Sequence, residues 1–373
     1  MAKAKEITGL DGTARASEGI KLMLVTRMEE MCAGRDAALD WSDIEGVHAM
    51  RVASRRLRSA LHDFAPYLRK RRLAVARGEL KVIAGALGKV RDEDVAIVEL
   101  KKLAADAPVE VAAGIRRFAD ERREARVEMR ARLIDALTQD AVAQLREDFS
   151  RALEKAVKPR RRKQGKKHGR DDDKAANESL SFREAGREII TARLAQVREL
   201  SASLYYPLEA EPLHRLRIAA KRLRYALELF SPCYGGADAL KVFAEEVAEL
   251  QSSLGTLHDC DEWIASFGAR LARGANNGGD GDDAGINEIG GDNSAGHVDF
   301  VQVDESERCA AVWLLNRFVK TRAKQFRASL VRRQEWETSR FAARLQAALT
   351  MDARLPAHYS DGGGDPVFTG RDE

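Results

Sequence analysis

The chain has few of the residues that build sheets, disulfide frameworks or membrane spans. Aromatic residues make up only 6% of its 373 residues, and proline occurs eight times. The four cysteines, Cys32, Cys233, Cys260 and Cys309, are scattered, which indicates reduced thiols rather than a disulfide scaffold. No apolar run approaches the roughly 20 residues needed to span a bilayer, and the first residues lack the apolar core of a signal peptide. We therefore expect a soluble cytoplasmic protein with no membrane span.

Charged residues, by contrast, are abundant and unevenly distributed. They make up 33% of the chain, against about 25% in a typical globular protein. Together with the scarcity of strand-forming residues, this composition predicts an all-α fold with a thin core. The formal net charge is only +4, but residues 274–305 hold eight acidic side chains and no Lys or Arg. The rest of the chain therefore carries +12, which favours a polyanionic partner.

The helical pattern is interrupted twice. Helical periodicity covers residues 16–157, 180–271 and 306–349, separated by one segment rich in Lys and Arg and another rich in Gly and Asp. Segments of these two compositions are typical of solvated linkers. We therefore predict a first helical half at 15–157, a basic linker at 158–178, a second helical half at 179–350 with an acidic Gly-rich insertion at 274–305, and a flexible tail at 351–373.

Local signals mark several helix ends. The spacings of Ser42 with Glu45 and of Ser181 with Glu184 predict capping boxes at two helix starts. Pro66 and Pro232 each follow an apolar helical run and should end it.

Two motifs occur twice, in the same order. Residues 48–66 (HAMRVASRRLRSALHDFAP) match residues 214–232 (HRLRIAAKRLRYALELFSP) at ten of 19 positions. Residues 87–94 (LGKVRDED) then match residues 254–261 (LGTLHDCD). The offset is 166 residues for the first pair and 167 for the second, so the second copy has one more residue between its two motifs than the first. This pattern predicts an internal duplication.

The first motif places basic side chains along one face of a helix. At about 100° per residue, five side chains fall within an arc of roughly 80°: His48, Arg51, Arg55, Arg58 and His62. The second copy repeats the pattern and has Glu228 where the first has His62: His214, Arg217, Lys221 and Arg224. We call these two sets the basic stripes. Leu57, Leu61 and Phe64 form the apolar edge beside the first stripe.

Such a stripe has two interpretations. It is either a solvated basic face or an anion-binding surface. Like charges three or four residues apart cost a helix a few tenths of a kcal/mol per pair, so a stripe kept in both copies favours the second interpretation. Arg is well suited to phosphate because its planar donor groups match the phosphate oxygens.

The second motif also has two interpretations. Gly88 and Gly255 could end helices in the left-handed conformation, so that Asp92 and Asp259 cap the next helices. Alternatively, the acidic residues of this motif orient the stripe arginines or hold a divalent cation beside a phosphate chain: Asp92, Asp94, Asp259 and Asp261.

Taken together, the two motifs resemble the CHAD family, which is named for its histidines and its α-helical domain. The matching patterns are H-x-x-R-[IV]-A-x-[RK]-R-L-R-x-A-L and L-G-x-x-[RH]-D-x-D, and the resemblance covers roughly residues 15–350. It implies two helical bundles related by a pseudo-two-fold axis, with a basic groove between them that binds inorganic polyphosphate. It implies no catalysis and no cofactor, and it suggests association with polyphosphate or polyhydroxyalkanoate granules.

The resemblance also implies the binding residues. Those matching the family motif are His48, Arg51, Arg55, Arg56, Arg58, His214, Arg217, Lys221, Arg222 and Arg224. His62, Arg91 and His258 are secondary candidates. The two copies differ at His62 against Glu228 and at Arg91 against His258, so we expect the two halves of the site to contribute unequally.

Two other functions compete with this one. An HD-type metal phosphohydrolase would use His214, His258 and Asp259 as ligands, but the first copy has Arg91 in place of His258. A nucleic-acid-binding protein would use the basic body of the chain, but aromatic residues that could stack on bases are not interleaved with the stripes.

Overall fold

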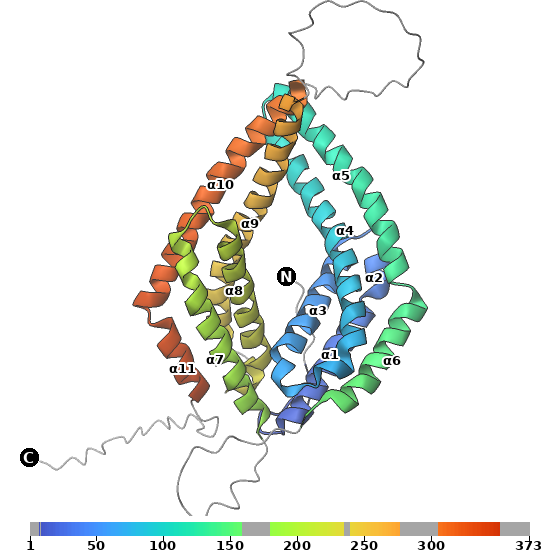
Figure 1. The fold of residues 1–373 in the computed structure, drawn as a ribbon, viewed down its shortest axis with the longest axis vertical. Helices are drawn as coiled ribbons and strands as arrows, with labels where there is room; N and C mark the ends of the chain where they lie inside the picture. The colour runs from blue at the N-terminus through green and yellow to red at the C-terminus, as the bar shows by residue number, and fades with distance from the viewer. Residues whose placement is uncertain (1–6, 8, 159–179, 235–238, 277–304, 351–373) are drawn as a thin grey trace, which may run out of the picture.

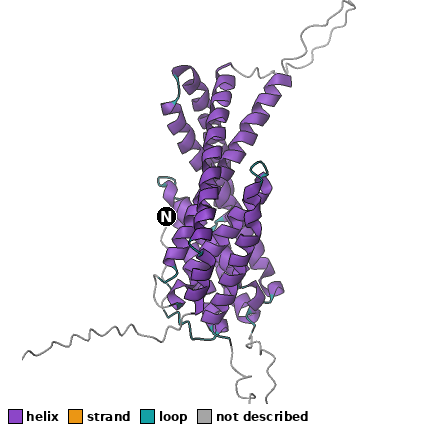
Figure 2. Cartoon of the chain, turned by 90° about the vertical axis from the view of Figure 1, so that its left-hand side faces the viewer, coloured by secondary structure: helices purple, strands orange, loops and turns teal. Residues whose placement is uncertain are grey.

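Long helices running along a common axis build the protein (Figures 1 and 2). The computed structural model describes residues 7, 9–158, 180–234, 239–276 and 305–350. The first half contains α1 (Ala16–Ala33), α2 (Arg35–Leu39), α3 (Ile44–Asp63), α4 (Ala74–Asp106), α5 (Val109–Ala136) and α6 (Gln139–Ala156). The second contains α7 (Phe182–Leu200), α8 (Ala210–Phe230), α9 (Lys241–Asn276), α10 (Glu305–Thr338) and α11 (Phe341–Thr350). These described residues form no strand, which confirms the all-α prediction.

Most of the predicted linker, insertion and tail lies outside the described residues. The helices around them are well bounded, since α6 ends at Ala156, α7 begins at Phe182, and α10 begins at Glu305. Among the described helices, none has an apolar stretch long enough to cross a bilayer. All four cysteines are free thiols, as their scattered spacing predicts.

Three of the four capping-box and proline signals for helix ends are confirmed. Ser181 and Glu184 form the predicted capping box at the start of α7, with the Ser181 hydroxyl accepting from the Glu184 amide at 3.2 Å. Pro66 and Pro232 lie in short 3-10 turns directly after α3 and α8. The capping box at Ser42 is wrong. Asp43 caps α3 instead, because the Ser42 hydroxyl donates to Asp40 at 2.7 Å while the Asp43 carboxylate accepts from the Glu45 amide at 2.8 Å.

The prediction that Gly88 and Gly255 end helices is also wrong. Gly88 lies in the middle of α4 and Gly255 in the middle of α9, so Asp92 and Asp259 cap nothing. Glycine in a helix costs about 1 kcal/mol relative to alanine. Here the buried neighbours Leu87 and Val90 hold α4 against the core, as Leu254 and Leu257 hold α9, and this packing outweighs the cost.

A large apolar core at one end of the molecule joins the two halves. At its centre Phe64 from the end of α3, Phe182 from α7 and Phe230 from the end of α8 meet, with ring centroids 5.0–6.1 Å apart. All three rings are fully buried, and such aromatic pairs add about 0.5–1.5 kcal/mol beyond the burial itself. This contact fixes the C-terminal ends of α3 and α8, the two helices that carry the basic stripes.

A second, smaller core closes the opposite end, where α4, α5, α9 and α10 converge (Figure 1). Phe118 of α5, Phe267 of α9 and Phe318 of α10 pack together there with Leu103 of α4. We call this end the tip and the end that holds Phe64 the base. The helices of the two halves therefore meet at the base and again at the tip, and the functional site lies between these two contacts.

Candidate functional site

The basic stripe of α3 forms as predicted, with its apolar edge in the core. Leu57, Leu61 and Phe64 are each at most 2% exposed. Arg51 and Arg55 are half-buried and turn toward the second half of the molecule. Burial of the apolar edge fixes the rotation of α3 about its axis, and this rotation directs the charged face toward the second half of the molecule.

The stripe of α8 faces that of α3. Burial is the main cause that lowers the pKa of Lys221 to about 7, and the nearby guanidinium groups of Arg55, Arg217, Arg222 and Arg51 lower it further. Burial likewise lowers the pKa of Arg217, with Arg55 adding to the effect. Side chains of both stripes therefore lie close enough to repel each other, and their positive charge is only partly balanced by the protein.

A pocket of about 1050 Å³ lies between the two halves, which we call the central pocket. Its described basic and imidazole lining residues are Arg51, Arg55, Arg91, Arg122, His214, Arg217, His258 and Arg317. Six of these eight belong to the repeated motifs. Arg122 and Arg317 come from α5 and α10, outside the repeated motifs, and no pattern in the sequence indicated them.

Two histidines from different helices meet in the central pocket. The Nδ1 atoms of His214 and His258 lie 3.2 Å apart, and Arg217 places a guanidinium nitrogen 3.4 Å from Nδ1 of His214. Burial and then the charge of Arg217 lower the pKa of both rings. In the first half, Arg91 takes the place of His258. After burial, its charge is the largest of the causes that lower the pKa of His48.

The acidic residues of the second motif hold arginines. Asp92 pairs with Arg51 at 3.2 Å, as one interpretation of the motif predicts. Asp94 and Asp261 instead bind arginines outside the stripes, Arg126 at 3.1 Å and Arg322 at 2.5 Å. Within the described residues, no cluster of three or more His, Cys, Asp and Glu side chains is arranged to hold a metal ion.

The charge in the central pocket changes along its length. The lining carboxylates follow Arg91 on α4 and His258 on α9: Asp92, Glu93, Glu99, Asp259 and Glu262. Both helices lead from there to the tip, where Leu103 and Phe267 join the smaller core. The part of the pocket nearest the tip is therefore of mixed charge, and the positive part lies toward the base, between the stripes of α3 and α8.

Two of the predicted binding residues turn away from this region. Arg56 lies 3.3 Å from Glu30 of α1. Arg224 is only 6% exposed and binds Gln251 at 2.8 Å and Glu228 at 2.7 Å. Arg56 sits one position off the stripe of α3, whereas Arg224 lies on the stripe of α8 but two turns closer to the base than Arg217. A carboxylate balances the charge of each, Glu30 for Arg56 and Glu228 for Arg224.

Arg58 and His62 line a second pocket, of about 630 Å³, at the C-terminal end of α3. We call it the end pocket. Its other polar lining residues are Lys70, Arg77, Lys81 and Arg193. Arg222 lies near it, since its charge is one of the causes, after burial, that lower the pKa of His62 to about 4.

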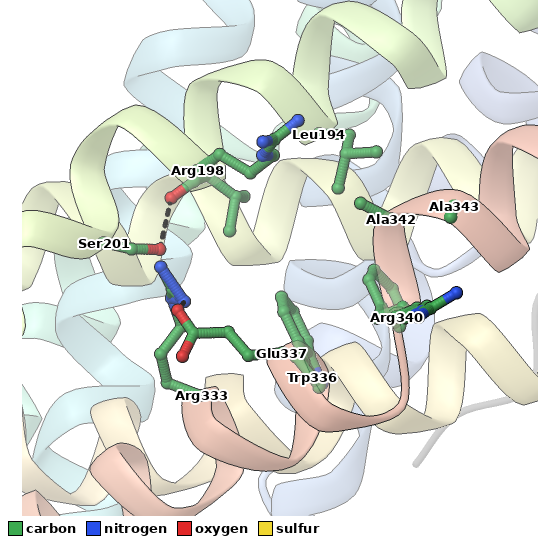
Figure 3. A pocket seen from close by; sticks show the side chains of 11 residues that line it. Leu194, Arg198, Ser201, Arg333, Trp336, Glu337, Arg340, Ala342 and Ala343 are labelled. Carbon is green, nitrogen blue, oxygen red and sulfur yellow. Dashed lines mark hydrogen bonds and ion pairs between the residues drawn. The ribbon is translucent and has the colours of Figure 1, made fainter.

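A third pocket, of about 290 Å³, lies between α7, α10 and α11 (Figure 3). Leu194 and Arg198 project from α7 on one side, and Trp336 and Arg340 lie on the other. The Trp336 ring stacks on Phe341 with a centroid distance of 4.3 Å, so the floor of this pocket is largely apolar. Arg198, Arg333 and Arg340 also line this pocket, and Glu337 pairs with Arg333.

The model of the CHAD domain family matches residues 23–267 of the chain. Among solved structures, the CHAD domain from the plant Ricinus communis matches with a TM-score of 0.63 and 21% identity, covering 88% of this chain and 96% of that one. PptA from Streptomyces chartreusis matches with a TM-score of 0.56 and 16% identity, covering 86% of this chain and all of that one. No curated protein matches.

Proposed function

The chain belongs to the CHAD family, and on this premise we propose that it binds inorganic polyphosphate, without catalysis, between the basic stripes of α3 and α8. The observation that carries the proposal is the position of Lys221. This lysine is largely buried, and four arginines surround it, so that its pKa falls to about 7. An anion bound there would relieve both the repulsion and the lowered pKa.

The shape of the positive region favours a linear polyanion over a single phosphate. Its charges follow two helices rather than converging on one point. From Arg51 to His62 the stripe of α3 rises about 17 Å, at 1.5 Å per residue. A flexible chain of phosphates can place one group against each turn of the helix.

The surroundings favour phosphate over nucleic acid. Among the described residues, two aromatic rings line the central pocket, Trp263 and Phe318. They stack on each other at 5.5 Å, and Trp263 also stacks on Phe267 at 5.4 Å. Because the rings of Phe267 and Phe318 already stack on Trp263, the Trp263 ring leaves little surface on which a nucleic-acid base could stack. We therefore expect duplex and single-stranded nucleic acids to compete poorly.

The contact between His214 and His258 keeps the HD-type phosphohydrolase as the second candidate, because such enzymes bring histidines together at a metal. Metal analysis of the purified protein decides between the two. Stoichiometric, tightly held metal would support the enzyme and contradict non-catalytic binding.

Binding assays with long-chain polyphosphate test the proposal directly. We expect the Arg51→Ala, Arg55→Ala, Arg217→Ala triple variant to lose about a hundredfold in affinity, because three charge-assisted contacts disappear. The matched control replaces the exposed arginines Arg116, Arg308 and Arg327 with alanine, which changes the net charge equally outside both basic pockets.

Equal losses in the triple variant and the control would show that general charge, and not the stripes, carries the affinity. Displacement of polyphosphate by nucleic acid at equal phosphate concentration would also contradict the proposal. Association with polyphosphate granules would follow from the same affinity, and the triple variant should lose it.

A further inference from the structure

The end pocket shares helix α3 with the central pocket. Arg55 lines the central pocket and Arg58, three residues later, lines the end pocket, about 4.5 Å further along the helix axis. Lys221 and Arg222 of α8 extend the same positive region. The charge of Arg55 lowers the pKa of Lys221, and the charge of Arg222 lowers the pKa of His62, in both cases in addition to burial. One continuous row of cations therefore joins the two pockets.

The end pocket is more uniformly basic than the central one. Among the residues that the structure describes, those lining it include five cations and no carboxylate. Asp63, with its side chain 1% exposed, lies beneath and pairs with Arg193 at 2.8 Å. In the described part of the chain, Nε of Arg77 is buried with no hydrogen-bond partner.

His62, which also lines this pocket, can donate a hydrogen bond from its neutral ring. Its Nδ1 lies 2.8 Å from a guanidinium nitrogen of Arg193. Because an arginine can only donate, Nδ1 accepts, and the proton of the neutral ring must be on Nε2. Burial first, and then Arg222, Arg193 and Arg77, lower the pKa of His62 to about 4, so the ring stays neutral near pH 7.

In the described part of the second half, the positions that correspond to the end pocket are less basic. Glu228 replaces His62 there and neutralises Arg224, the counterpart of Arg58, at 2.7 Å. The small pocket beside Glu228 has a volume of only about 40 Å³ and contains Asp63 as well. The positions that correspond to Arg77 and Lys81 fall on Phe243–Ala244 and Val247–Ala248. Among the described residues, the row of cations therefore continues from the central pocket along the first half and not along the second.

We propose that the end pocket is a second phosphate-binding subsite, which holds the continuation of a polyphosphate chain already seated in the central pocket. The proposal rests on the proposed function. A chain that spans both pockets must cover the length of the α3 stripe, far more than the distance between the ends of a tripolyphosphate. A long chain therefore gains affinity from the second pocket because its attachment there is intramolecular.

The test compares affinities for long-chain polyphosphate and tripolyphosphate by calorimetry. The variant is Lys70→Ala with Lys81→Ala, both exposed, so folding should be unaffected. The matched control is Lys101→Ala with Lys102→Ala, two exposed lysines of α4 outside both pockets. A second variant, His62→Glu, gives the first half the acidic residue found in the second.

We expect the preference for the long chain to fall about tenfold in the Lys70/Lys81 variant and in His62→Glu, and to stay at the wild-type value in the control. If both variants keep the wild-type preference while the wild type binds long chains, the end pocket is not a subsite and the proposed function stands. If the wild type binds neither ligand, the proposed function itself fails.

Discussion

Replacing Lys221 with methionine separates the stability of the protein from its affinity for the ligand. Lys221 is surrounded by Arg51, Arg55, Arg217 and Arg222, and burial is the main reason that its pKa falls to about 7. Methionine has a similar length and a similar helix propensity but carries no charge. The change should therefore stabilise the protein without ligand and weaken its binding of polyphosphate.

The magnitude follows from the lowered pKa. At about 1.4 kcal/mol per pH unit, the drop from 10.5 to about 7 corresponds to about 5 kcal/mol. Replacing a buried charged group with an apolar one typically gains about 1–4 kcal/mol, so we expect a gain of about 3 kcal/mol at acidic pH. In the unfolded chain Lys221 stays protonated up to its ordinary pKa of 10.5. The destabilisation of the folded protein by the Lys221 charge is therefore complete below pH 7 and decreases as pH rises toward 10.5.

Urea denaturation of the two proteins at about pH 6 and about pH 9 measures this difference. The gain in free energy of unfolding should fall by more than half between the two conditions. Lys101→Met, at an exposed position of α4, serves as the control and should change stability by no more than about 0.5 kcal/mol. With polyphosphate, the slope of log affinity against log salt should decrease by roughly 1 in Lys221→Met. A loss of stability in Lys221→Met at about pH 6 would refute the reasoning, because it would mean that the protein itself balances this charge.

Two further predictions concern the histidine pair and the helix contacts. Because burial and Arg217 lower the pKa of His214 and His258, both rings should be neutral near pH 7 and take up protons with the ligand, so affinity for long-chain polyphosphate should rise as pH falls below the ordinary value of 6.5. Calorimetry in buffers of different ionisation enthalpy would detect this uptake, and a His214→Gln, His258→Gln variant that kept the same pH dependence would contradict it. Gly114→Ala should lower the free energy of unfolding by about 1–3 kcal/mol, because its Cβ would lie 2.3 Å from the Ser306 carbonyl oxygen of α10. Gly88→Ala, which meets nothing within 4 Å, should raise it by up to about 1 kcal/mol, and a destabilising effect there would argue against a continuous α4.

The sequence by itself determined the helices and the orientation of the stripes on them. Periodicity is a local property, since a residue's angle on a helix depends only on its position in the chain. The burial of Leu57, Leu61 and Phe64 therefore followed directly from their spacing. The same holds for the half-buried positions of Arg51 on the adjoining face of α3 and of Arg217 on α8. The duplication behind the two stripes stays a prediction from the repeated motifs.

Only the tertiary structure decided which charges meet. Arg224 and Arg217 have similar sequence contexts, yet Gln251 and Glu228 hold Arg224 in the core while Arg217 lines the central pocket. Arg77 and Arg193 joined the end pocket from α4 and α7 with no motif to indicate them. Gly88 stayed helical because core contacts on both sides of it outweigh its backbone entropy. Apart from the Arg224–Glu228 pair, which lies within α8, the deciding partners lie on other helices, and packing, not spacing along the chain, sets those distances.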